Sequence, residues 1–443
     1  MNVPPTSADP AAAFASIDFA SLNSVVVAVS GGSDSLALLY LLLDRSKREA
    51  AFPRIVAVTV DHGLRPESAA EAAYVAQLCE RAGIAHRTMR WEGPKPDSAL
   101  SSKAREARYR LLCEAAADLG AQAILTGHTL DDQIETYAMR LERAKEASDA
   151  RGLAAMAPAT LLERRYWLLR PLLGTSRETL RRYLQRAGVE WRDDPSNENV
   201  DYERVRVRNR LRGGDRAPLQ RRIAEHAARR QGLGADAATL LPSLLAMEGD
   251  DLAIVSRQPA GPDPQRLATG AILAIIGGQE FLPAAAQCDR AVAFLADGEA
   301  GKKASLARCI LESRRRSTAI YRELRGIPTH IVEPGATIVW DGRYRVSNGG
   351  HTPVTIMPRG RQADAAGQPS PLQRRAAASA PSLVRSDGTL VEDFASACVS
   401  VTRHLSLFDR VLSGYDVALA QSFAHILKLQ AYPAPPVNQI NKN

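Results

Sequence analysis

The chain has 443 residues, too many for one hydrophobic core, so we expect two or three domains. Its 57 Lys and Arg residues against 49 Asp and Glu residues give a net charge of +8, which is modest for this length. The five cysteines are scattered without a C-x-x-C pair, which excludes a disulfide framework and a cysteine metal site. The longest apolar run, Leu36 to Leu43, is too short to span a bilayer, and with no signal sequence we expect a cytoplasmic protein.

Residues 1–20 are rich in Ala and Pro, and we expect a flexible lead-in there. The stretch from Val25 to Leu39, VVVAVSGGSDSLALL, then predicts a buried parallel strand, a tight turn of small residues and the start of a helix near Ser35. A turn of this kind leaves backbone N–H groups beside a helix N-terminus, which suits a phosphate. The residues of this predicted phosphate-binding turn are Ser30, Gly31, Gly32, Ser33, Asp34 and Ser35.

The turn is neither a Walker loop, since no Gly-Lys-Ser/Thr closes it, nor a G-x-G-x-x-G dinucleotide turn. Its carboxylate is the informative group. Asp34 would repel phosphates unless a cation lay between them, so it predicts magnesium bridging a pyrophosphate.

Strand and helix patterns alternate after this turn, which predicts a Rossmann-like parallel α/β sheet. Predicted strands cover 55–60, 85–90 and 123–126, and predicted helices cover 67–82 and 98–119. The second strand leads into DHGLR at 61–65, at the carboxyl end where open sheets bind ligands. On the helix 98–119, Arg105, Arg108 and Tyr109 share one face.

A second chemical signal is GHTLDDQIET, which follows the strand 123–126. Gly127 frees the backbone at the strand's end. The next helix presents His128, Asp131 or Asp132, and Glu135 at three- and four-residue spacing. Acidic residues in a first helical turn are also ordinary caps, so the signal gains weight only beside SGGSDS.

Six motifs occur in a family-specific order: SGGSDS, DHGLR, AREARY at 104–109, GHTLDDQIET, RPLL at 170–173 and DPSN at 194–197. In this the chain resembles the tRNA(Ile)-lysidine synthetases of the PP-loop ATP pyrophosphatase superfamily, over roughly residues 22–212. One departure follows Leu141, where residues 142–152 replace a shorter glycine-containing turn.

The resemblance implies an ATP-dependent ligase that joins lysine to the wobble cytidine of a CAU-anticodon tRNA(Ile) through an adenylated intermediate. It implies that the SGGSDS turn and Gly127 hold ATP, and that Asp34 and Asp132 hold magnesium. His128 with Arg105 or Arg108 would stabilise the activated cytidine or the phosphoryl charge. The carboxylates available to free lysine are Asp131, Asp132 and Glu135, and their roles stay unassigned.

A basic stretch follows: residues 164–230 contain 18 Arg, no Lys and 9 acidic residues. Five of these arginines occupy every second position from 204 to 212. No acidic partners are evident in the sequence, so we expect a surface for tRNA phosphates that includes Arg204 and Arg208. We predict a catalytic domain over 21–215, a helical domain over 216–300 and a small α/β or β-rich region over 301–443, with a disordered loop near 360–381.

Two alternatives remain open. A PP-loop tRNA thiolase would deliver sulfur to the adenylated base, but such enzymes need a catalytic cysteine or cluster motif, and no cysteine here lies in one. An RNA-binding protein without catalysis would not need Asp34 and Asp132. The sequence carries no signal for an oligomeric state.

Overall fold

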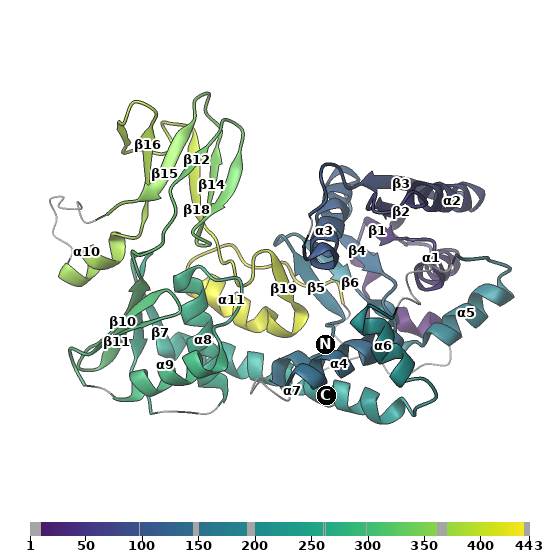
Figure 1. Cartoon of the computed structure of the whole chain (residues 1–443), viewed down its shortest axis with the longest axis horizontal. Helices are drawn as coiled ribbons and strands as arrows, with labels where there is room; N and C mark the ends of the chain where they lie inside the picture. Colours follow the sequence, from purple (N-terminus) through teal and green to yellow (C-terminus); the bar gives the residue numbers. More distant parts are fainter. Residues whose placement is uncertain are drawn as a thin grey trace. The chain divides into compact units, whose positions relative to one another are not determined.

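The computed structural model describes residues 10–96, 98–144, 150–192, 200–259, 261, 263–297, 299–360 and 370–437. The chain divides into two compact units, whose helices and strands are labelled in Figure 1. The first comprises Met1–Gln231, Ser413–Tyr415 and Pro433–Asn443, and the second comprises Gly232–Leu412 and Asp416–Tyr432. No helix in the described ranges is both long and apolar enough to cross a membrane.

The first unit is built on a mainly parallel sheet, in which the strands run β5-β6-β4-β1-β2-β3. Their bounds are β1 Ser24–Ala28, β2 Arg54–Asp61, β3 Ala85–Arg90, β4 Ala123–Thr126, β5 Ala159–Leu162 and β6 Tyr166–Leu169. β1 pairs in parallel with β2 and β4, β2 with β3, and β4 with β6, whereas β5 is antiparallel to β6. The predicted Rossmann-like α/β fold is thereby confirmed.

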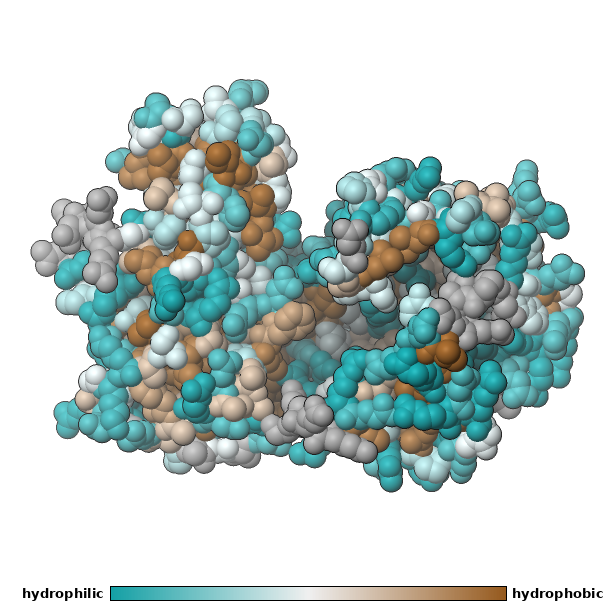
Figure 2. All heavy atoms as spheres, viewed as in Figure 1, coloured by the Kyte–Doolittle hydropathy of each residue, from teal (hydrophilic) through white to brown (hydrophobic). Residues whose placement is uncertain are grey.

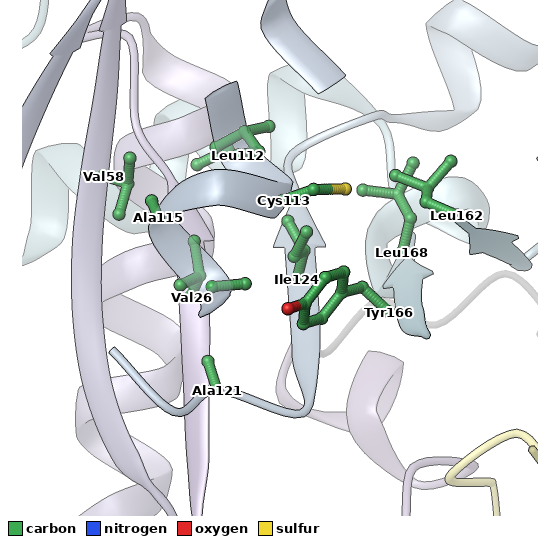
Figure 3. Close-up of a cluster of buried hydrophobic side chains, with 12 residues drawn as sticks. Val26, Val58, Leu112, Cys113, Ala115, Ala121, Ile124, Leu162, Tyr166 and Leu168 are labelled. Atoms are coloured by element: carbon green, nitrogen blue, oxygen red, sulfur yellow. The ribbon is translucent and has the colours of Figure 1, made fainter. Parts of the chain in front are cut away.

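Helices pack against this sheet, and β1, β4, β5 and β6 are buried along their whole length, whereas most residues of β3 are exposed. Their bounds are α1 Ser33–Ser46, α2 Ser68–Arg81, α3 Leu100–Asp118, α4 Leu130–Ala144 and α5 Arg177–Arg186. On one face, Leu112 and its neighbours on α3 pack against Val26, Val58 and Ile124 (Figure 3), all fully buried. Burying a side chain of this size contributes about 1.5–3 kcal/mol, so this core holds α3 against the sheet.

The expected flexible lead-in is structured where it is described. Residues 10–21 contain two 3-10 helices, η1 Pro10–Phe14 and η2 Phe19–Ser21. Phe14 and Phe19 are 1% and 3% exposed, and the Phe19 ring lies 4.7 Å from that of Phe52. Their spacing has no helical or strand period, which is why the sequence pattern alone did not indicate this docking.

The run of alternating arginines is helical from Arg204 to Arg210. α6 spans Glu203–Arg210 and α7 spans Ala217–Leu244. Arginines at every second position therefore circle the helix, and only pairs four residues apart, such as Arg204 and Arg208, share a face.

In the second unit an antiparallel sheet has the order β7-β8-β11-β10-β9, with α8 Asp263–Gly277 and α9 Ala285–Asp297. The bounds are β7 Leu245–Glu248, β8 Leu252–Ser256, β9 Lys303–Leu306, β10 Cys309–Ser313 and β11 Ser317–Arg322. The segment expected to be helical, 216–300, thus also contributes β7 and β8, and β8 pairs with β11 beyond the predicted boundary. The domain limits themselves stay predictions.

Two smaller sheets complete the β-rich region, β12-β15-β16-β17 and β13-β14-β18. Their bounds are β12 His330–Val332, β13 Thr337–Trp340, β14 Tyr344–Asn348, β15 Val354–Pro358, β16 Pro381–Arg385, β17 Leu390–Val391 and β18 Val399–Arg403. Figure 2 shows hydrophobic residues at the surface of this part, where Ile331 is 64% and Leu390 56% exposed. Of the loop expected at 360–381, residues 361–369 lie outside the described residues, whereas α10 Pro371–Ala377 is a capped helix. The final helix, α11, spans Val417–Ile426.

A buried carboxylate lies at the centre of a cluster of ion pairs in the second unit. Asp341 is inaccessible to solvent at its side chain and forms ion pairs with Arg308, Arg322 and Arg343. The side chains of Arg322 and Arg343 are each 1% exposed. Because buried charges are tolerated only when paired, this cluster depends on Asp341.

Candidate active site

Three motifs meet at one edge of the sheet. β1, β2 and β4 are parallel neighbours, so their carboxyl ends share an edge. SGGSDS follows β1, DHGLR follows β2 and GHTLDD follows β4. The structure therefore confirms that the predicted strand ends come together where open α/β sheets bind ligands.

The SGGSDS turn is held by its own hydroxyls. The Ser30 N–H donates to Ser35 Oγ at 3.1 Å, and Ser35 Oγ donates to the Gly32 carbonyl at 3.0 Å. Gly31 has a φ of +84°, and a Cβ there would lie 3.3 Å from Val75 Cγ2. Ser33 and Asp34 begin α1, with Ser33 Oγ donating to Asp34 Oδ1 at 3.1 Å. This fixed turn at a helix N-terminus suits an anion.

Gly127 joins two of the motifs by close packing. A Cβ at this position would lie 2.7 Å from the Asp34 carbonyl oxygen and 3.0 Å from Ser35 Cα. Only glycine therefore lets the first turn of α1 approach the end of β4. We expected Gly127 to contact ATP, and the structure gives it this packing role.

Asp132 has one oxygen in a helix cap and the other in the site. Its Oδ2 accepts the Thr129 N–H at 2.7 Å and Thr129 Oγ1 at 2.9 Å, which closes a capping box at the start of α4. Its Oδ1 accepts Arg204 Nη2 at 2.9 Å and Arg177 Nη2 at 3.5 Å. The ordinary cap and the site carboxylate are thus the same residue.

Arg177, at the start of α5, was not among the predicted site residues. Its Nε donates to Asp34 Oδ2 at 2.9 Å, and its backbone N–H donates to Asp131 Oδ2 at 2.8 Å. Asp131 Oδ1 accepts Arg216 Nη1 at 2.7 Å, so both oxygens of Asp131 are engaged. No local motif marks Arg177, because its carboxylate partners are far away in sequence.

Arg204 and Arg208 are ion-paired, which differs from the expected phosphate-facing arrangement. Arg204 Nε donates to Glu135 Oε2 at 2.6 Å, and Arg208 Nε to Glu135 Oε1 at 2.7 Å. Glu135 is 3% exposed. The acidic partners missing from the sequence around α6 come from α4, which packs against it.

His128 lies among cations. Its Nδ1 is 2.9 Å from Thr126 Oγ1. Burial, followed by the charges of Arg170 and Arg108, holds the pKa of His128 well below its ordinary value, so the ring is neutral at pH 7. The Arg105 guanidinium lies 4.9 Å from the centre of the Tyr109 ring.

Burial works to raise the pKa of the Tyr109 phenol, but Arg170, Arg105 and Arg108 together lower it. Arg105 and Arg108 therefore lie within electrostatic reach of His128, and the roles predicted for the three residues stay predictions. Tyr109 and Arg170 join them, and both stand in motifs, AREARY and RPLL, that the sequence already displayed.

The carboxylates of Asp34 and Asp132 fit a magnesium ion whose remaining ligands are water and phosphate oxygens. Among the described residues no group of three His, Cys, Asp or Glu side chains could hold a metal. Asp34 and Asp132, however, accept hydrogen bonds from one guanidinium, so a cation already lies between them. Magnesium usually takes one or two carboxylates with water and substrate phosphates. Burial raises the pKa of Asp34, and the charge of Arg177 opposes this effect.

Two sequence features fall partly or wholly outside the described residues. DPSN at 194–197 lies outside them. Of the altered loop at 142–152, residues 145–149 also lie outside. The segment that follows is anchored, because Arg140 Nη1 donates to the carbonyls of Gly152 at 2.7 Å and Ala155 at 2.9 Å.

Comparisons with known proteins show the family of this chain. Residues 9–213 match a family described as a PP-loop domain. The tRNA(Ile)-lysidine synthase of Rhizobium meliloti is 40% identical over 445 residues, covering 95% of this chain and 95% of the relative. That of Brucella melitensis is 39% identical over 419 residues, covering 90% and 93%. A solved U34-tRNA thiolase, NcsA from Methanococcus maripaludis, aligns at 18% identity and a TM-score of 0.40 over 48% of this chain and 76% of its own, a likeness too weak to bear on function. With such identity over nearly its whole length, the chain belongs to the tRNA(Ile)-lysidine synthase family.

Proposed function

We propose that this protein ligates free lysine to the wobble cytidine of a tRNA(Ile) with a CAU anticodon, consuming ATP and releasing AMP and pyrophosphate to form lysidine. The observation that carries the proposal is Asp34 within the SGGSDS turn, beside Asp132 at the same sheet edge. Lysidine synthases similar along 95% of the chain support the choice of substrate. Because tRNA is its substrate, we propose a cytoplasmic location.

In the first half-reaction the cytidine carbonyl oxygen attacks the α-phosphorus, and pyrophosphate leaves with the electron pair of the broken bond. The turn from Ser30 to Ser35 would bind the phosphates through its backbone N–H groups. Asp34 and Asp132 would hold magnesium, which offsets the charge that develops between the α- and β-phosphates. Neutral His128 would offer hydrogen bonds, while Arg105 and Arg108 supply positive charge to the activated cytidine.

In the second half-reaction the lysine ε-ammonium would first give a proton to a nearby carboxylate. The resulting amine attacks the adenylated ring carbon of the cytidine, and AMP leaves with the former carbonyl oxygen. Free lysine carries a carboxylate and two ammonium groups at neutral pH, so its site needs charges of both signs. Glu135 with Arg204 and Arg208 provides such a pairing, almost fully buried at the carboxylate. Asp131 and Asp132 are the other carboxylates at the site, and their oxygens, like those of Glu135, are engaged by neighbouring donors. We therefore propose that lysine binds among these three carboxylates.

A thiolase would need a thiolate, and the thiols nearest in sequence to the motifs do not provide one. Burial raises the pKa of Cys79 to about 11 and that of Cys113 to about 12. Both are buried in the first unit. The ligase is therefore the better supported of the two PP-loop reactions, and a merely RNA-binding protein leaves Asp34 without a role.

The experiment separates the half-reactions. Protein, magnesium, ATP and tRNA(Ile) without lysine should release pyrophosphate about once per active site at most. Adding lysine should release AMP and yield a cytidine heavier by one lysine less one water, which mass spectrometry of nucleosides detects. Asp34→Asn should abolish both steps, whereas Asp118→Asn, on the distant end of α3, should retain them. Resolution of the adenylate by sulfide or ammonia as efficiently as by lysine would defeat the assignment.

A further inference from the structure

We infer that Arg177 is an internal cation that occupies the metal position in the ligand-free enzyme, and that it releases Asp34 and Asp132 to magnesium when nucleotide binds and then contacts the phosphates. This positioning role rests on the proposed function, because it concerns the same ATP site. Arg177 itself lies outside every motif named above.

The geometry places one guanidinium on two carboxylates. Arg177 Nε lies 2.9 Å from Asp34 Oδ2, and its Nη2 lies 3.5 Å from Asp132 Oδ1. The three side chains are only 22%, 19% and 12% exposed, in that order. Two carboxylates that share one guanidinium and are this shielded repel one another, so the pair requires a cation. The chain supplies that cation itself.

Charge balance explains why the exchange would depend on nucleotide. Four site carboxylates, Asp34, Asp131, Asp132 and Glu135, are ion-paired with four guanidiniums, Arg177, Arg204, Arg208 and Arg216. A divalent cation alone would add two uncompensated charges to a partly buried site, which is costly. The phosphates of ATP bring the compensating negative charge. Metal and nucleotide should therefore bind together.

The start of α5 keeps Arg177 near the phosphate-binding turn. Ser176 caps the helix by accepting the Thr179 N–H at 3.2 Å, and the Arg177 N–H is fixed on Asp131. One turn later, Arg181 Nε donates to Ser33 Oγ at 3.4 Å. A guanidinium released from the carboxylates thus stays beside SGGSDS, where its planar donors match phosphate oxygens and offset charge on the departing pyrophosphate.

The test measures metal binding without nucleotide. Titration calorimetry should show that manganese binds Arg177→Gln more tightly than it binds the wild-type protein. Nearby unit charges alter such equilibria roughly 10- to 1,000-fold, so we expect a gain of about tenfold or more. Arg182→Gln removes the same charge from the same helix, at a side chain that is 59% exposed and 3.9 Å from Glu178. Its manganese affinity should not change.

A melting experiment and a second variant serve as controls for the manganese titration. Without metal, Arg177→Gln should melt at a lower temperature, and magnesium should restore its stability more than that of the unchanged protein. If Arg177→Gln does not fold, Arg177→Lys, which keeps the charge but loses the two-pronged contact, should show intermediate manganese affinity. Affinity equal to that of the unchanged protein in the folded variant overturns the inference. Because neither readout needs tRNA or lysine, failure to make lysidine would count against the proposed function alone.

Discussion

Gly127→Ala tests whether the contact between two motifs sets the catalytic geometry. The added Cβ would lie 2.7 Å from the Asp34 carbonyl oxygen, 2.9 Å from its carbonyl carbon and 3.0 Å from Ser35 Cα. All three are backbone atoms, so no side chain can rotate away. Gly127 does not have a positive φ, so alanine meets no backbone strain of its own and the effect is purely steric.

The expected size follows from that overlap. Forcing one extra methyl into a packed contact typically costs about 1–3 kcal/mol. Relief requires the start of α1 to move away from β4, which shifts Asp34 relative to Asp132. A displacement near 1 Å can lower a rate by about 100-fold. We therefore expect a moderate loss of stability and a much larger loss of pyrophosphate release, with tRNA binding nearly retained.

Urea unfolding and tRNA-dependent pyrophosphate release measure the two effects separately. Gly232→Ala is the matched control, because Gly232 lies inside α7 with no heavy atom within 4 Å of the added Cβ. It should stabilise the helix by about 0.5–1 kcal/mol and leave activity unchanged. A Gly127→Ala protein that releases pyrophosphate at the ordinary rate would refute the packing argument.

Three further predictions concern buried charges. Asp341→Ala should cost about 3–5 kcal/mol in urea unfolding, because buried Arg322 loses its carboxylate partner and Arg343 keeps only Asp251. Exposed Glu280→Ala should change little. Arg208→Ala should lower the free energy of unfolding by about 1–3 kcal/mol, because Glu135 loses one of its two arginine partners. The salt dependence of tRNA binding should stay unchanged, because Arg208 pairs with Glu135. The pKa of His128 is well below its ordinary value of 6.5. Below pH 6.5 this side chain is therefore protonated in the unfolded chain but still neutral in the folded one, so the free energy of unfolding falls as the pH drops. His128→Asn should make the midpoint of urea unfolding less dependent on pH between about pH 7 and 5.

The sequence predicted those parts of the site whose signals are local. An apolar strand followed by Gly31 and Gly32 specifies a turn by short-range sterics, and the same holds for Gly127 after β4. Parallel pairing then requires both turns to share an edge. This reasoning predicts that SGGSDS and GHTLDD meet at one edge, whereas the pairing of Asp34 with Asp132 as magnesium ligands came from the family resemblance.

Contacts between distant segments were beyond such reasoning. Arg177 meets Asp34 across 143 positions of sequence and Asp132 across 45. Neither spacing produces a periodic signal. The alternating arginines posed a related difficulty, since the pattern fits a strand with one basic face or a helix with none. The helix, once packed on α4, pairs Arg204 and Arg208 with Glu135.

The capping role of Asp132 is compatible with the catalytic role proposed for it. A free aspartate side chain samples several rotamers, and its carboxylate points in no fixed direction. Here Thr129 holds Oδ2 by two hydrogen bonds of 2.7 and 2.9 Å, which fixes the side chain and directs Oδ1 to Arg177 and Arg204. A metal ligand must be held in place before the metal arrives, because ordering it on binding would cost affinity. The cap holds the side chain in the folded protein, so the hydrogen bonds that make Asp132 look structural in sequence would also orient it as the proposed magnesium ligand.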